Sequence, residues 1–414
     1  MSILHAIAMH LFAFGLQLAG ALGHDKARRA SLGRRGWHRR LVAAAANRPG
    51  PWLHVHCASL GEYEQAAPVI SALRKAWPGH AVLLTFFSPS GREACPPDAA
   101  DHIDYLPIDT PQNAQKFAAA MPFQASCWVK YELWPAHLKA LERRGVSTHL
   151  FAAHFIAGHH PLSAWSGYYR RALQTMGSIQ VQDSSSVGRL ASFGLHAIAT
   201  GDPRYDRVQT TAEPLIPAEL QKVTDWIDGR KILIAGSSWP AEEEALAALA
   251  SNPAWPADWC LLVVPHEVAP EKIAATRKRL ASVPPPRLFI VDRIGWLRAL
   301  YPLSDLAVVG GGWGAGIHNI LEPAAHGLPI AFGPRHERFL EAERLVQCGG
   351  AFAAPTPQAL NTQLQFWMRN PADRQNAATA SRQHIDQAAG AAQRIADHII
   401  VSSNRKNPVS TGCL

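Results

Sequence analysis

The feature that most constrains the fold is a repeated alternation of short apolar runs with helical segments. The runs are rich in β-branched residues and end in turn signals, a pattern typical of buried parallel strands. They form two series, WLHVHCA, VLLTFF, ASCWVKY, STHLFAA and SIQVQ before position 200, and KILIAG, WCLLVV, RLFIVD, DLAVVGG and LPIAF after position 230. Between them lie helical segments such as residues 65–77, whose apolar side chains share one stripe. This alternation predicts an α/β fold with parallel sheets covered by helices on both faces.

A chain of 414 residues is long enough for two such domains, each with its own core. The proline-containing segment at 210–217, TTAEPLIP, separates the two series and is the predicted linker. We therefore predict a Rossmann-like N-terminal domain over residues 24–209 and a second one over residues 218–414. The second would include helices from 360 to about 400, and residues 402–414 would form a disordered tail. Ligands of doubly wound domains bind at the carboxyl ends of the strands, so we expect an interdomain cleft there.

The N-terminus predicts a membrane anchor over residues 1–23. Ile3–Leu22 is almost uninterruptedly apolar, and at the rise of a helix it reaches about 30 Å, enough to cross a bilayer. No basic residue precedes it, which argues against a secretory signal peptide. A basic segment follows, with Lys26, Arg28, Arg29, Arg34, Arg35, Arg39 and Arg40. Such a flank suits anionic lipids and places the rest of the chain in the cytoplasm.

The orientation of this anchor stays open at the level of the sequence. His10 and Gln17 lie seven residues apart and share one helical face, so a helix lying in the membrane interface is an alternative to a spanning one. A helix buried in a soluble domain ranks third, because it leaves the dense basic flank unexplained.

The overall charge points to an anionic partner. The net charge is +8 and the pI is near 9.3, which suits nucleic acid, anionic lipid or a phosphorylated substrate. The six cysteines are scattered without a C-x-x-C pair, and there is no H-E-x-x-H, so we expect reduced thiols and no metal site. The pair His159–His160 is interpreted as surface.

A glycine-rich turn is the strongest candidate for a ligand site. After the apolar run 306–309 come Gly310, Gly311, Gly312, Gly314 and Gly316. Asn319 is expected to cap a helix that runs to about residue 326 and ends at Gly327. Free backbone N–H groups at such a turn bind phosphate, although an ordinary βα turn is the alternative. Neither the dinucleotide fingerprint G-x-G-x-x-G nor a P-loop fits these glycines.

Three clusters in the first half of the chain carry ionisable groups just after predicted strands. Glu62, in HCASLGE, is a candidate general base if it is partly desolvated, and the dipole of the next helix would keep it ionised. Lys130 and Glu132, in VKYELWP, would share one face of a strand beside a rigid Trp134 wall. Arg204, in GDPRYD, can bind a carboxylate or a phosphate. A helix cap, a buried ion pair and a surface turn are the respective alternatives.

Two clusters in the second half have the same placement. Ser237 and Ser238, in GSSW, offer hydroxyl and backbone donors at a helix start, with Ser238 as a plain N-cap in the alternative. His266, in PHE, follows the next apolar run, and a simple turn is its alternative. All these clusters follow strand ends, and in doubly wound domains such ends converge.

The motifs LHVHCASLGE, KYELWP, TGDPRYD, GSSW, VPHE and GGGWGAGIHNILEPAAHGLPIAFGP resemble the serial motifs of the 3-deoxy-D-manno-octulosonic acid (Kdo) transferases. The likeness covers nearly the whole chain, including the anchor. It implies the GT-B fold, with the donor nucleotide bound mainly by the C-terminal domain. It also implies transfer of Kdo from CMP-Kdo to the lipid A precursor lipid IVA in lipopolysaccharide biosynthesis. The reaction would take place at the inner face of the inner membrane, with inversion, no cofactor and no metal.

The resemblance also implies roles for particular residues. Glu62 corresponds to the general base and Glu132 to a second acidic residue near the reaction centre. The donor-side positions are Ser237, Ser238, His266, Gly310, Gly311, Gly312, Asn319 and Glu322, with Glu322 where the fold grips the ribose. Lys130 and Arg204 are assigned to acceptor or phosphate binding, and both depart from the family, which often has Glu and Lys there. Residues 335–339 are also more charged than usual, so these departures concern acceptor recognition.

Two other functions are weighed against this one. The first is another cell-envelope GT-B enzyme that uses a uridine donor. The second is a non-catalytic basic protein that binds nucleic acid or anionic lipid through residues 26–40. No aromatics interleave with that basic run and no recognition motif is present, so we expect no nucleic-acid partner. A nicotinamide dehydrogenase is weaker still, because the fingerprint is absent.

Overall fold

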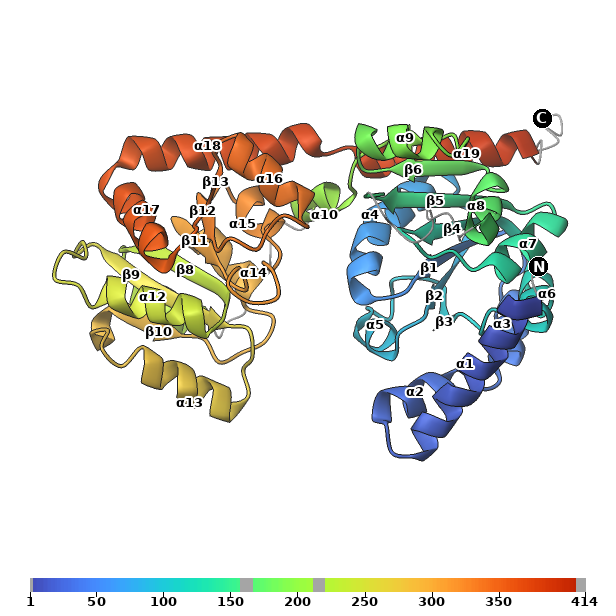
Figure 1. The fold of residues 1–414 in the computed structure, drawn as a ribbon, viewed down its shortest axis with the longest axis horizontal. Coiled ribbons are helices and arrows are strands. Elements are labelled where there is room, and N and C mark those ends of the chain that lie inside the picture. Colours follow the sequence, from blue (N-terminus) through green and yellow to red (C-terminus); the bar gives the residue numbers. More distant parts are fainter. Residues whose placement is uncertain (1–2, 157–166, 211–219, 407–414) are drawn as a thin grey trace. The chain divides into compact units, whose positions relative to one another are not determined.

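The computed structural model describes residues 3–156, 167–210 and 220–406, and it divides into two compact units (Figure 1). The N-terminal unit comprises Met1–Arg207 together with Ala389–Leu414, and the C-terminal unit comprises Val208–Ala388. The pair His159–His160, and the predicted linker beyond residue 210, lie outside the described residues.

The N-terminal unit is built on a parallel sheet of seven strands in the order β3-β2-β1-β4-β5-β6-β7. The strands are β1 (Trp52–Cys57), β2 (Ala81–Phe86), β3 (His102–Tyr105), β4 (Phe123–Val129), β5 (Ser147–Ala153), β6 (Ser178–Val181) and β7 (Ile198–Ala199). The five predicted strands are confirmed. The two others lie at or near the edges of the sheet, where a short or polar segment is enough to continue the pairing.

Helices cover both faces of this sheet. The helices that precede or follow its strands in the chain are α1 (Ile3–Ala21), α2 (Asp25–Gly33), α3 (Trp37–Asn47), α4 (Leu60–Ala76), α5 (Pro89–Ala94), α6 (Pro111–Ala120), α7 (Pro135–Arg143), α8 (Gly167–Gln174), α9 (Ser184–Ala191), α10 (Arg204–Thr210), which crosses the boundary between the units, and α19 (Ala391–Lys406). One apolar cluster joins α3, α6 and α7 to the sheet, and a second joins α4 and α19 to it. The predicted two-sided covering is therefore present.

The C-terminal unit repeats this plan with a parallel sheet of six strands in the order β10-β9-β8-β11-β12-β13. Its strands are β8 (Lys231–Ser238), β9 (Trp259–Pro265), β10 (Leu288–Ile290), β11 (Leu306–Val309), β12 (Ile330–Phe332) and β13 (Ala351–Ala353). Its helices are α11 (Gln221–Ile227), α12 (Pro240–Ala250), α13 (Pro270–Arg279), α14 (Leu297–Leu300), α15 (Leu321–Ala325), α16 (Leu340–Gln347), α17 (Pro357–Arg369) and α18 (Pro371–Ala388). The five strands predicted in this half are confirmed, and β13 is an additional edge strand.

In each sheet the strand order reverses beside the first strand. The reversal falls between β1 and β4 in the N-terminal unit and between β8 and β11 in the C-terminal unit. The loops at the carboxyl ends of these strands diverge at such a switch point and leave room for a ligand. Two Rossmann-like domains, the architecture of the GT-B fold, are therefore confirmed, and the loops at the two switch points are the candidates for ligand binding.

The last helix differs from the prediction. We assigned residues 218–414 to the second domain, but α19 packs in the N-terminal unit. Its apolar residues Ala392, Ile395, Ala396 and Ile399 form one stripe that is buried against α4 and the sheet. His149 of β5 also bonds Ser403 of α19, with 3.0 Å between Nε2 and Oγ. The helix continues to Lys406, so residues 402–406 are ordered where a tail was predicted.

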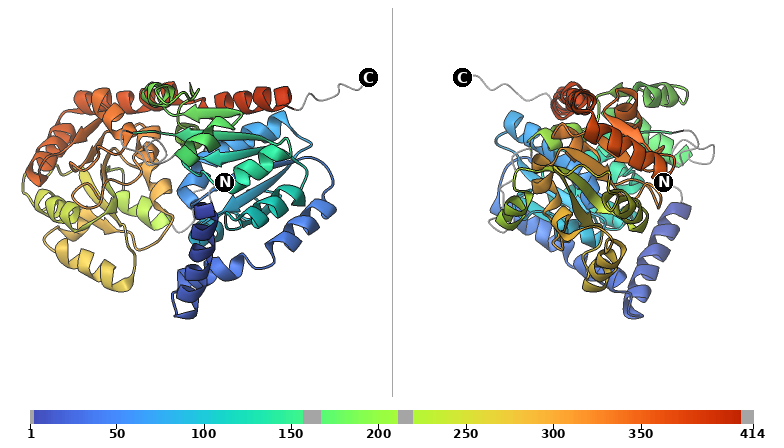
Figure 2. Two further views of the ribbon diagram at one scale, coloured as in Figure 1. Left: turned by 45° about the vertical axis from the view of Figure 1, so that its right-hand side comes forward. Right: turned by 90° about the vertical axis from the view of Figure 1, so that its left-hand side faces the viewer.

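The N-terminal helix α1 is apolar, extends away from the sheet and pairs with α2 (Figure 2). Within it, residues 4–21 are apolar enough and long enough to cross a membrane, and 6% of them are buried. The turn at Gly23, with φ 94°, folds α2 back along α1, and an added Cβ at Gly20 would lie 2.9 Å from the Cα of Arg28. At the other end, His5 Nε2 lies 2.8 Å from Asp109 Oδ2. Both ends of α1 are thus fixed to the N-terminal unit.

Candidate functional site

Two carboxylates meet at the switch point of the N-terminal sheet. Glu62 lies in the first turn of α4, after β1, and Glu132 lies in the loop between β4 and α7. Burial and the neighbouring negative charge of Glu132 raise the pKa of Glu62 to about 7, although the Ala58 N–H and Lys130 oppose the rise. We call Glu62 and Glu132 the carboxylate pair.

Glu62 is partly desolvated, as predicted, but its pKa of about 7 disagrees with the prediction that the dipole of the next helix keeps it ionised. The helix dipole was expected to keep it charged, and burial together with Glu132 outweighs that effect. Glu62 also accepts a hydrogen bond from the Ala58 N–H, which precedes the helix. Glu62 can therefore cap the helix and also act as a base, because a carboxylate has more than one acceptor site.

Glu132 is held by aromatic neighbours. Trp134 Nε1 donates to Glu132 Oε2 at 2.9 Å, and His56 Nε2 lies 3.3 Å from the same oxygen. The Trp134 ring stacks on Phe87 with 5.0 Å between centroids, and Phe87 stacks on Phe12 of α1 at 6.0 Å. Trp134 therefore forms a wall beside Glu132, and this wall continues to the N-terminal helix.

The prediction that Lys130 and Glu132 share one face of a strand is wrong. The strand β4 ends at Val129, and Lys130 adopts φ 55°, which takes the chain out of the extended conformation. Its N–H donates to Phe151 O at 2.9 Å. A left-handed backbone is rare for lysine, so this turn was not predictable from the residue types. The Lys130 charge instead acts on Glu62, whose pKa it lowers.

Arg204 was predicted to bind a carboxylate or a phosphate. In the structure it binds the carboxylate of Asp202. Arg204 Nε and Nη2 lie 2.8 Å and 2.6 Å from Asp202 Oδ2. Asp202 is buried and accepts from Gln65 Nε2 of α4 at 3.2 Å. The alternative of a surface turn is wrong, because the turn is fixed to the helix that carries Glu62.

In the C-terminal unit, the glycine turn follows β11 at the switch point, but its N–H groups are engaged. Gly310 N–H donates to Gly236 O and Gly311 N–H to Glu242 Oε1, both at 2.9 Å. Gly314 N–H and Gly316 N–H both donate to Gly311 O. The prediction that these particular groups are free for a phosphate is therefore wrong. The Gly311 N–H binds a carboxylate of the protein itself, the buried Glu242 of α12, and burial raises the pKa of Glu242.

The glycines are required for contacts between loops. An added Cβ at Gly310 would lie 2.1 Å from Ser237 O, and one at Gly312 would lie 2.4 Å from Gly333 N. No side chain fits at either position without moving backbone atoms. The predicted close approach is real, but the partner is the protein's own backbone.

The helix after this turn is shorter than predicted. It is α15, its N-cap is Ile320 rather than Asn319, and it ends at Ala325. Asn319 Oδ1 still accepts from the Leu321 N–H at 3.1 Å, and Gly327 follows the end with φ 67°, as predicted. Glu322 lies in the first turn of α15, and burial together with this carboxylate raises the pKa of Tyr301.

The serines lie at the other side of the same switch point. Ser237 adopts φ 50°, and Ser238 ends β8 and donates from Oγ to Glu243 Oε1 at 3.1 Å. The N-cap of α12 is Trp239, so the alternative in which Ser238 is a plain N-cap is wrong.

A stack of three rings near these loops was not predicted as a whole. His266 lies 4.8 Å from Trp239 and 4.4 Å from His318 between ring centroids. Trp239 Nε1 also donates to His318 Nε2 at 2.9 Å. Trp239 and His266 border a pocket of about 110 Å³, whose lining includes Lys272 and Arg279. Only His266 was predicted as a site residue, although the position of Trp239 directly after β8 was a usable signal.

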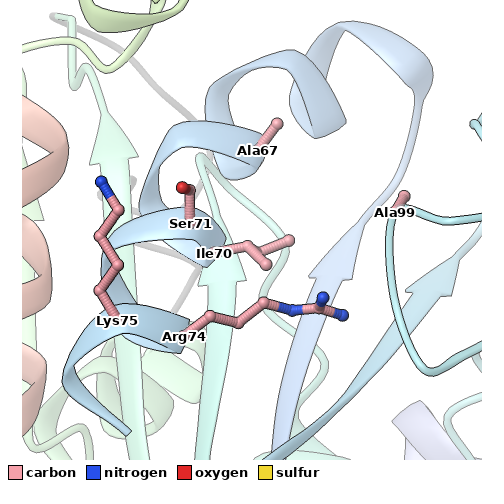
Figure 3. Close-up of a pocket in the computed structure, with 6 residues that line it drawn as sticks. All are labelled: Ala67, Ile70, Ser71, Arg74, Lys75 and Ala99. Carbon is pink, nitrogen blue, oxygen red and sulfur yellow. The ribbon is translucent and has the colours of Figure 1, made fainter. Parts of the chain in front are cut away.

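A second hollow lies along α4 and is lined by Ala67, Ile70, Ser71, Arg74, Lys75 and Ala99 (Figure 3). Arg74 and Lys75 point in different directions there, and Arg74 Nη2 is bonded to Asp101 Oδ2 at 3.0 Å. No carboxylate lines this hollow, so the carboxylate pair remains the better candidate for catalysis.

Comparison with known proteins gives consistent results. The family model described as 3-deoxy-D-manno-octulosonic-acid transferase (kdotransferase) matches residues 35–207. The 3-deoxy-D-manno-octulosonic acid transferase of Haemophilus influenzae is 28% identical over 84% of this chain and 86% of that protein. The enzyme of the same name from Bordetella pertussis is 29% identical over 86% and 90%. Among solved structures, the UDP-GlcNAc 2-epimerase of Neisseria meningitidis superposes with a TM-score of 0.62 at 16% identity, covering 86% of this chain and all of that one. This last similarity concerns the fold alone.

Proposed function

Because the chain belongs to the Kdo transferase family, and is thus a glycosyltransferase of lipopolysaccharide biosynthesis, we propose that it transfers Kdo from CMP-Kdo to the lipid A precursor lipid IVA. We propose that the transfer inverts the anomeric carbon and needs no metal or other cofactor. The observation that carries this proposal is the carboxylate pair, in which the pKa of Glu62 is raised to about 7.

The pair suits the chemistry of a single displacement. The acceptor hydroxyl attacks the anomeric carbon of Kdo, its oxygen forms the new bond, and the bond to the CMP phosphate breaks. Glu62 takes the hydroxyl proton, and CMP leaves with the bonding electrons. A base with a pKa near the working pH is efficient, because it is ionised and still holds the proton well. Glu132 is one of the two causes of the raised pKa of Glu62, after burial.

The donor would be held by the C-terminal unit. Its proposed ligands are Ser237, Ser238, His266, Gly311, Gly312, Asn319 and Glu322. In support, Ser237 and Ser238 end β8, His266 follows β9, and the others follow β11 in the segment up to the first turn of α15. The strand order reverses between β8 and β11. Since the Gly311 N–H is bound to Glu242, its part is to shape the loop. Lys130 and Arg204 remain proposed contacts of acceptor or donor phosphate.

We propose that α1 attaches the protein to the cytoplasmic face of the inner membrane as an interfacial helix. The helix has 19 residues, so His5 lies about 25 Å from its C-terminal end. If α1 spanned the bilayer, His5 would therefore lie on the opposite side of the membrane from the rest of the chain. The contact of His5 with the buried Asp109 and the stack of Phe12 on Phe87 both favour a helix that stays with its domain. Leu11 and Phe14 are 65% and 64% exposed and would enter the lipid.

The basic flank has two parts. Arg34 is buried, where it donates to the Leu106 and Phe87 carbonyls, and Arg40 is bonded to Asp104. These two residues therefore build the fold. Lys26, Arg28, Arg35 and Arg39 are exposed and suit anionic headgroups.

The transfer is tested by incubating the protein with CMP-Kdo and a tetraacylated disaccharide precursor and measuring product mass. Glu62→Gln should lower the rate by about a hundredfold or more, as expected for a lost general base. Glu64→Gln, on the same helix, is the matched control and should retain activity. Full activity of Glu62→Gln would remove Glu62 as the base, and inhibition by UDP but not by CMP would favour the uridine-donor alternative.

The anchor is tested with vesicles that contain anionic lipid. Replacing Leu11 and Phe14 by Glu should release the protein from them, while Val401→Glu, at a position 50% exposed on α19, should not. A cysteine at position 4 should react with an impermeant maleimide from the cytoplasmic side only. Reaction from the periplasmic side would show a spanning helix.

A further inference from the structure

A histidine and an aspartate meet at the carboxyl edge of the N-terminal sheet, and the reaction proposed above uses neither. His154 directly follows β5, and Asp183 lies between β6 and α9. His154 Nδ1 lies 2.5 Å from Asp183 Oδ2, and the two side chains are 25% and 8% exposed. We call these two residues the histidine–aspartate pair. Strand β5 is the neighbour of β4, whose loop carries Glu132, so the pair lies on the same edge of the sheet as the carboxylate pair.

The carboxylate of Asp183 is held by more hydrogen bonds than a helix cap needs. Its Oδ1 accepts from the Ser186 N–H at 2.9 Å and from the Ser185 hydroxyl, and its Oδ2 accepts from the Ser186 hydroxyl at 2.9 Å. Burial alone would raise the pKa of Asp183, but the hydrogen bonds from His154, Ser185 and Ser186 lower it. Asp183 is therefore ionised at neutral pH and acts only as an acceptor.

This carboxylate fixes one hydrogen on His154 and leaves the other ring nitrogen for a ligand. An ionised carboxylate carries no hydrogen, so the hydrogen between the two groups lies on Nδ1, whether the ring is neutral or charged. Among the described residues, none is hydrogen-bonded to His154 Nε2. A carboxylate that holds one ring nitrogen of a histidine sets the direction of the other, which is how catalytic triads orient theirs.

The backbone on both sides of His154 is held by side chains of neighbouring loops. The Tyr131 hydroxyl donates to the His154 carbonyl oxygen, and the Tyr131 oxygen accepts from the His154 N–H at 3.3 Å. The Phe155 N–H donates to Ser186 Oγ at 2.9 Å. Because Tyr131 directly precedes Glu132, these bonds connect the loop of the histidine–aspartate pair to the loop of the carboxylate pair.

An irregularity in β5 sets the direction in which His154 leaves the sheet. Ala152 is buried and has φ 56°, a left-handed conformation that is unfavourable for any residue with a Cβ. The register of β5 against β6 shifts between Leu150 and Ala153, and Gln182 Nε2 holds the Ala152 carbonyl oxygen at 3.0 Å. Irregularities of this kind re-aim side chains next to active sites, and strained backbone persists where the surroundings enforce it.

We propose that His154, held by Asp183, is a substrate contact whose Nε2 binds a sugar hydroxyl beside the carboxylate pair. The proposal rests on the function proposed above and adds a binding residue to its site. A hydroxyl suits this nitrogen because it can donate to a bare Nε2 or accept from a protonated one. An anionic group would bind only the protonated ring. Both proposed substrates, the Kdo donor and the disaccharide acceptor, carry sugar hydroxyls.

The alternative is that the histidine–aspartate pair only ties β5 to α9, and two substitutions separate the two roles. The polar atoms of asparagine are as many bonds from the backbone as Nδ1 is, so His154→Asn can still bond Asp183 but cannot reach a ligand of Nε2. The polar atoms of glutamine correspond to Nε2 in the same way. His154→Gln therefore keeps a group for the substrate and gives up the bond to Asp183.

Initial rates of Kdo transfer are measured with each substrate varied in turn. In His154→Asn the KM for the contacted sugar should rise about threefold to tenfold, the range for one uncharged hydrogen bond, and His154→Gln should restore most of this loss. A higher KM for CMP-Kdo assigns the hydroxyl to the donor, and a higher KM for the lipid acceptor assigns it to the acceptor. A normal KM in His154→Asn, with or without a defect in His154→Gln, would overturn the contact.

A second histidine next to an aspartate provides the matched control. His102 is 23% exposed and its Nε2 lies 3.6 Å from Asp104 Oδ2, but it begins β3 and so lies at the opposite, amino edge of the sheet. His102→Asn should leave both KM values unchanged. An equal rise in KM in this variant would show a general effect of losing a histidine and would count against the role of His154.

A binding measurement separates this inference from the proposed function. Protein labelled with ¹⁵N at histidine is titrated separately with CMP-Kdo and with the deacylated disaccharide of the acceptor, and the His154 signal is assigned by its absence in His154→Gln. One of the two ligands should shift the Nε2 signal of His154. Such a shift supports the contact even if no Kdo is transferred, an outcome that would defeat only the proposed function. If Kdo is transferred and neither ligand at saturation shifts this signal, the contact is overturned and the proposed function stands. Absence of both transfer and shift would remove both.

Discussion

The rate of transfer should depend on pH through the ionisation of Glu62. Burial and Glu132 raise the pKa of this carboxyl to about 7, and only its ionised form accepts a proton. At that value about a tenth of the enzyme is ionised at pH 6 and about nine tenths at pH 8, so kcat should rise about tenfold between them. A glutamate with the ordinary value of 4.5 would be ionised throughout this range and would give a flat profile.

The assay is the initial rate of CMP release, measured from pH 5.5 to 8.5 with both substrates saturating and the ionic strength constant. Glu132→Gln removes the charge that raises the pKa of Glu62, so its acidic limb should lie at lower pH. Glu62→Gln should show a low rate without this limb. A flat wild-type profile between pH 6 and 8, or the same limb in the residual activity of Glu62→Gln, would refute the assignment of Glu62 as base.

Three further predictions concern the fold and the chemistry. Gly312→Ala would force a Cβ to within 2.4 Å of Gly333 N and should lower the unfolding free energy, measured by urea titration, by about 1–3 kcal/mol. Gly314→Ala is the control, because its Cβ would lie 3.5 Å from Gly311 O, and it should leave the unfolding free energy nearly unchanged. Asp183→Ala removes the N-cap of α9, which accepts from Ser186 N–H at 2.9 Å, and should cost about 1 kcal/mol. Burial alone would raise the pKa of Asp183, but hydrogen bonds lower it, so this contribution is present above pH 3.8 and is lost as the pH falls below that value. Chelators such as EDTA should leave Kdo transfer unchanged, and loss of activity that returns with added metal would contradict the metal-free mechanism.

The sequence was sufficient for the architecture because the apolar runs of both halves have the length and composition of buried strands. The apolar pattern did not predict elements whose formation or placement depends on neighbouring elements. HIDY at β3 is half polar, and it becomes a strand because β2 offers it a free edge. The stripe on α19 showed that this helix must be covered, but an apolar stripe does not indicate which domain covers it.

The site was predicted by residue type better than by geometry. A glycine-rich turn indicates that backbone approaches something closely, and Gly311 and Gly312 do so, but the sequence cannot distinguish a ligand from another loop. The positive φ of Lys130 has no sequence signature, so its relation to Glu132 was misplaced.

The packing of α19 on α4 has a consequence for synthesis. A ribosome makes the first domain early, but the segment that completes its apolar core is translated almost last, after the whole second domain. Until then the nascent N-terminal domain exposes the apolar surface that Ile395 and Ile399 will cover, and such surfaces recruit chaperones or aggregate. A chain that terminates prematurely near residue 388 would therefore contain every catalytic group and still lack a finished first domain.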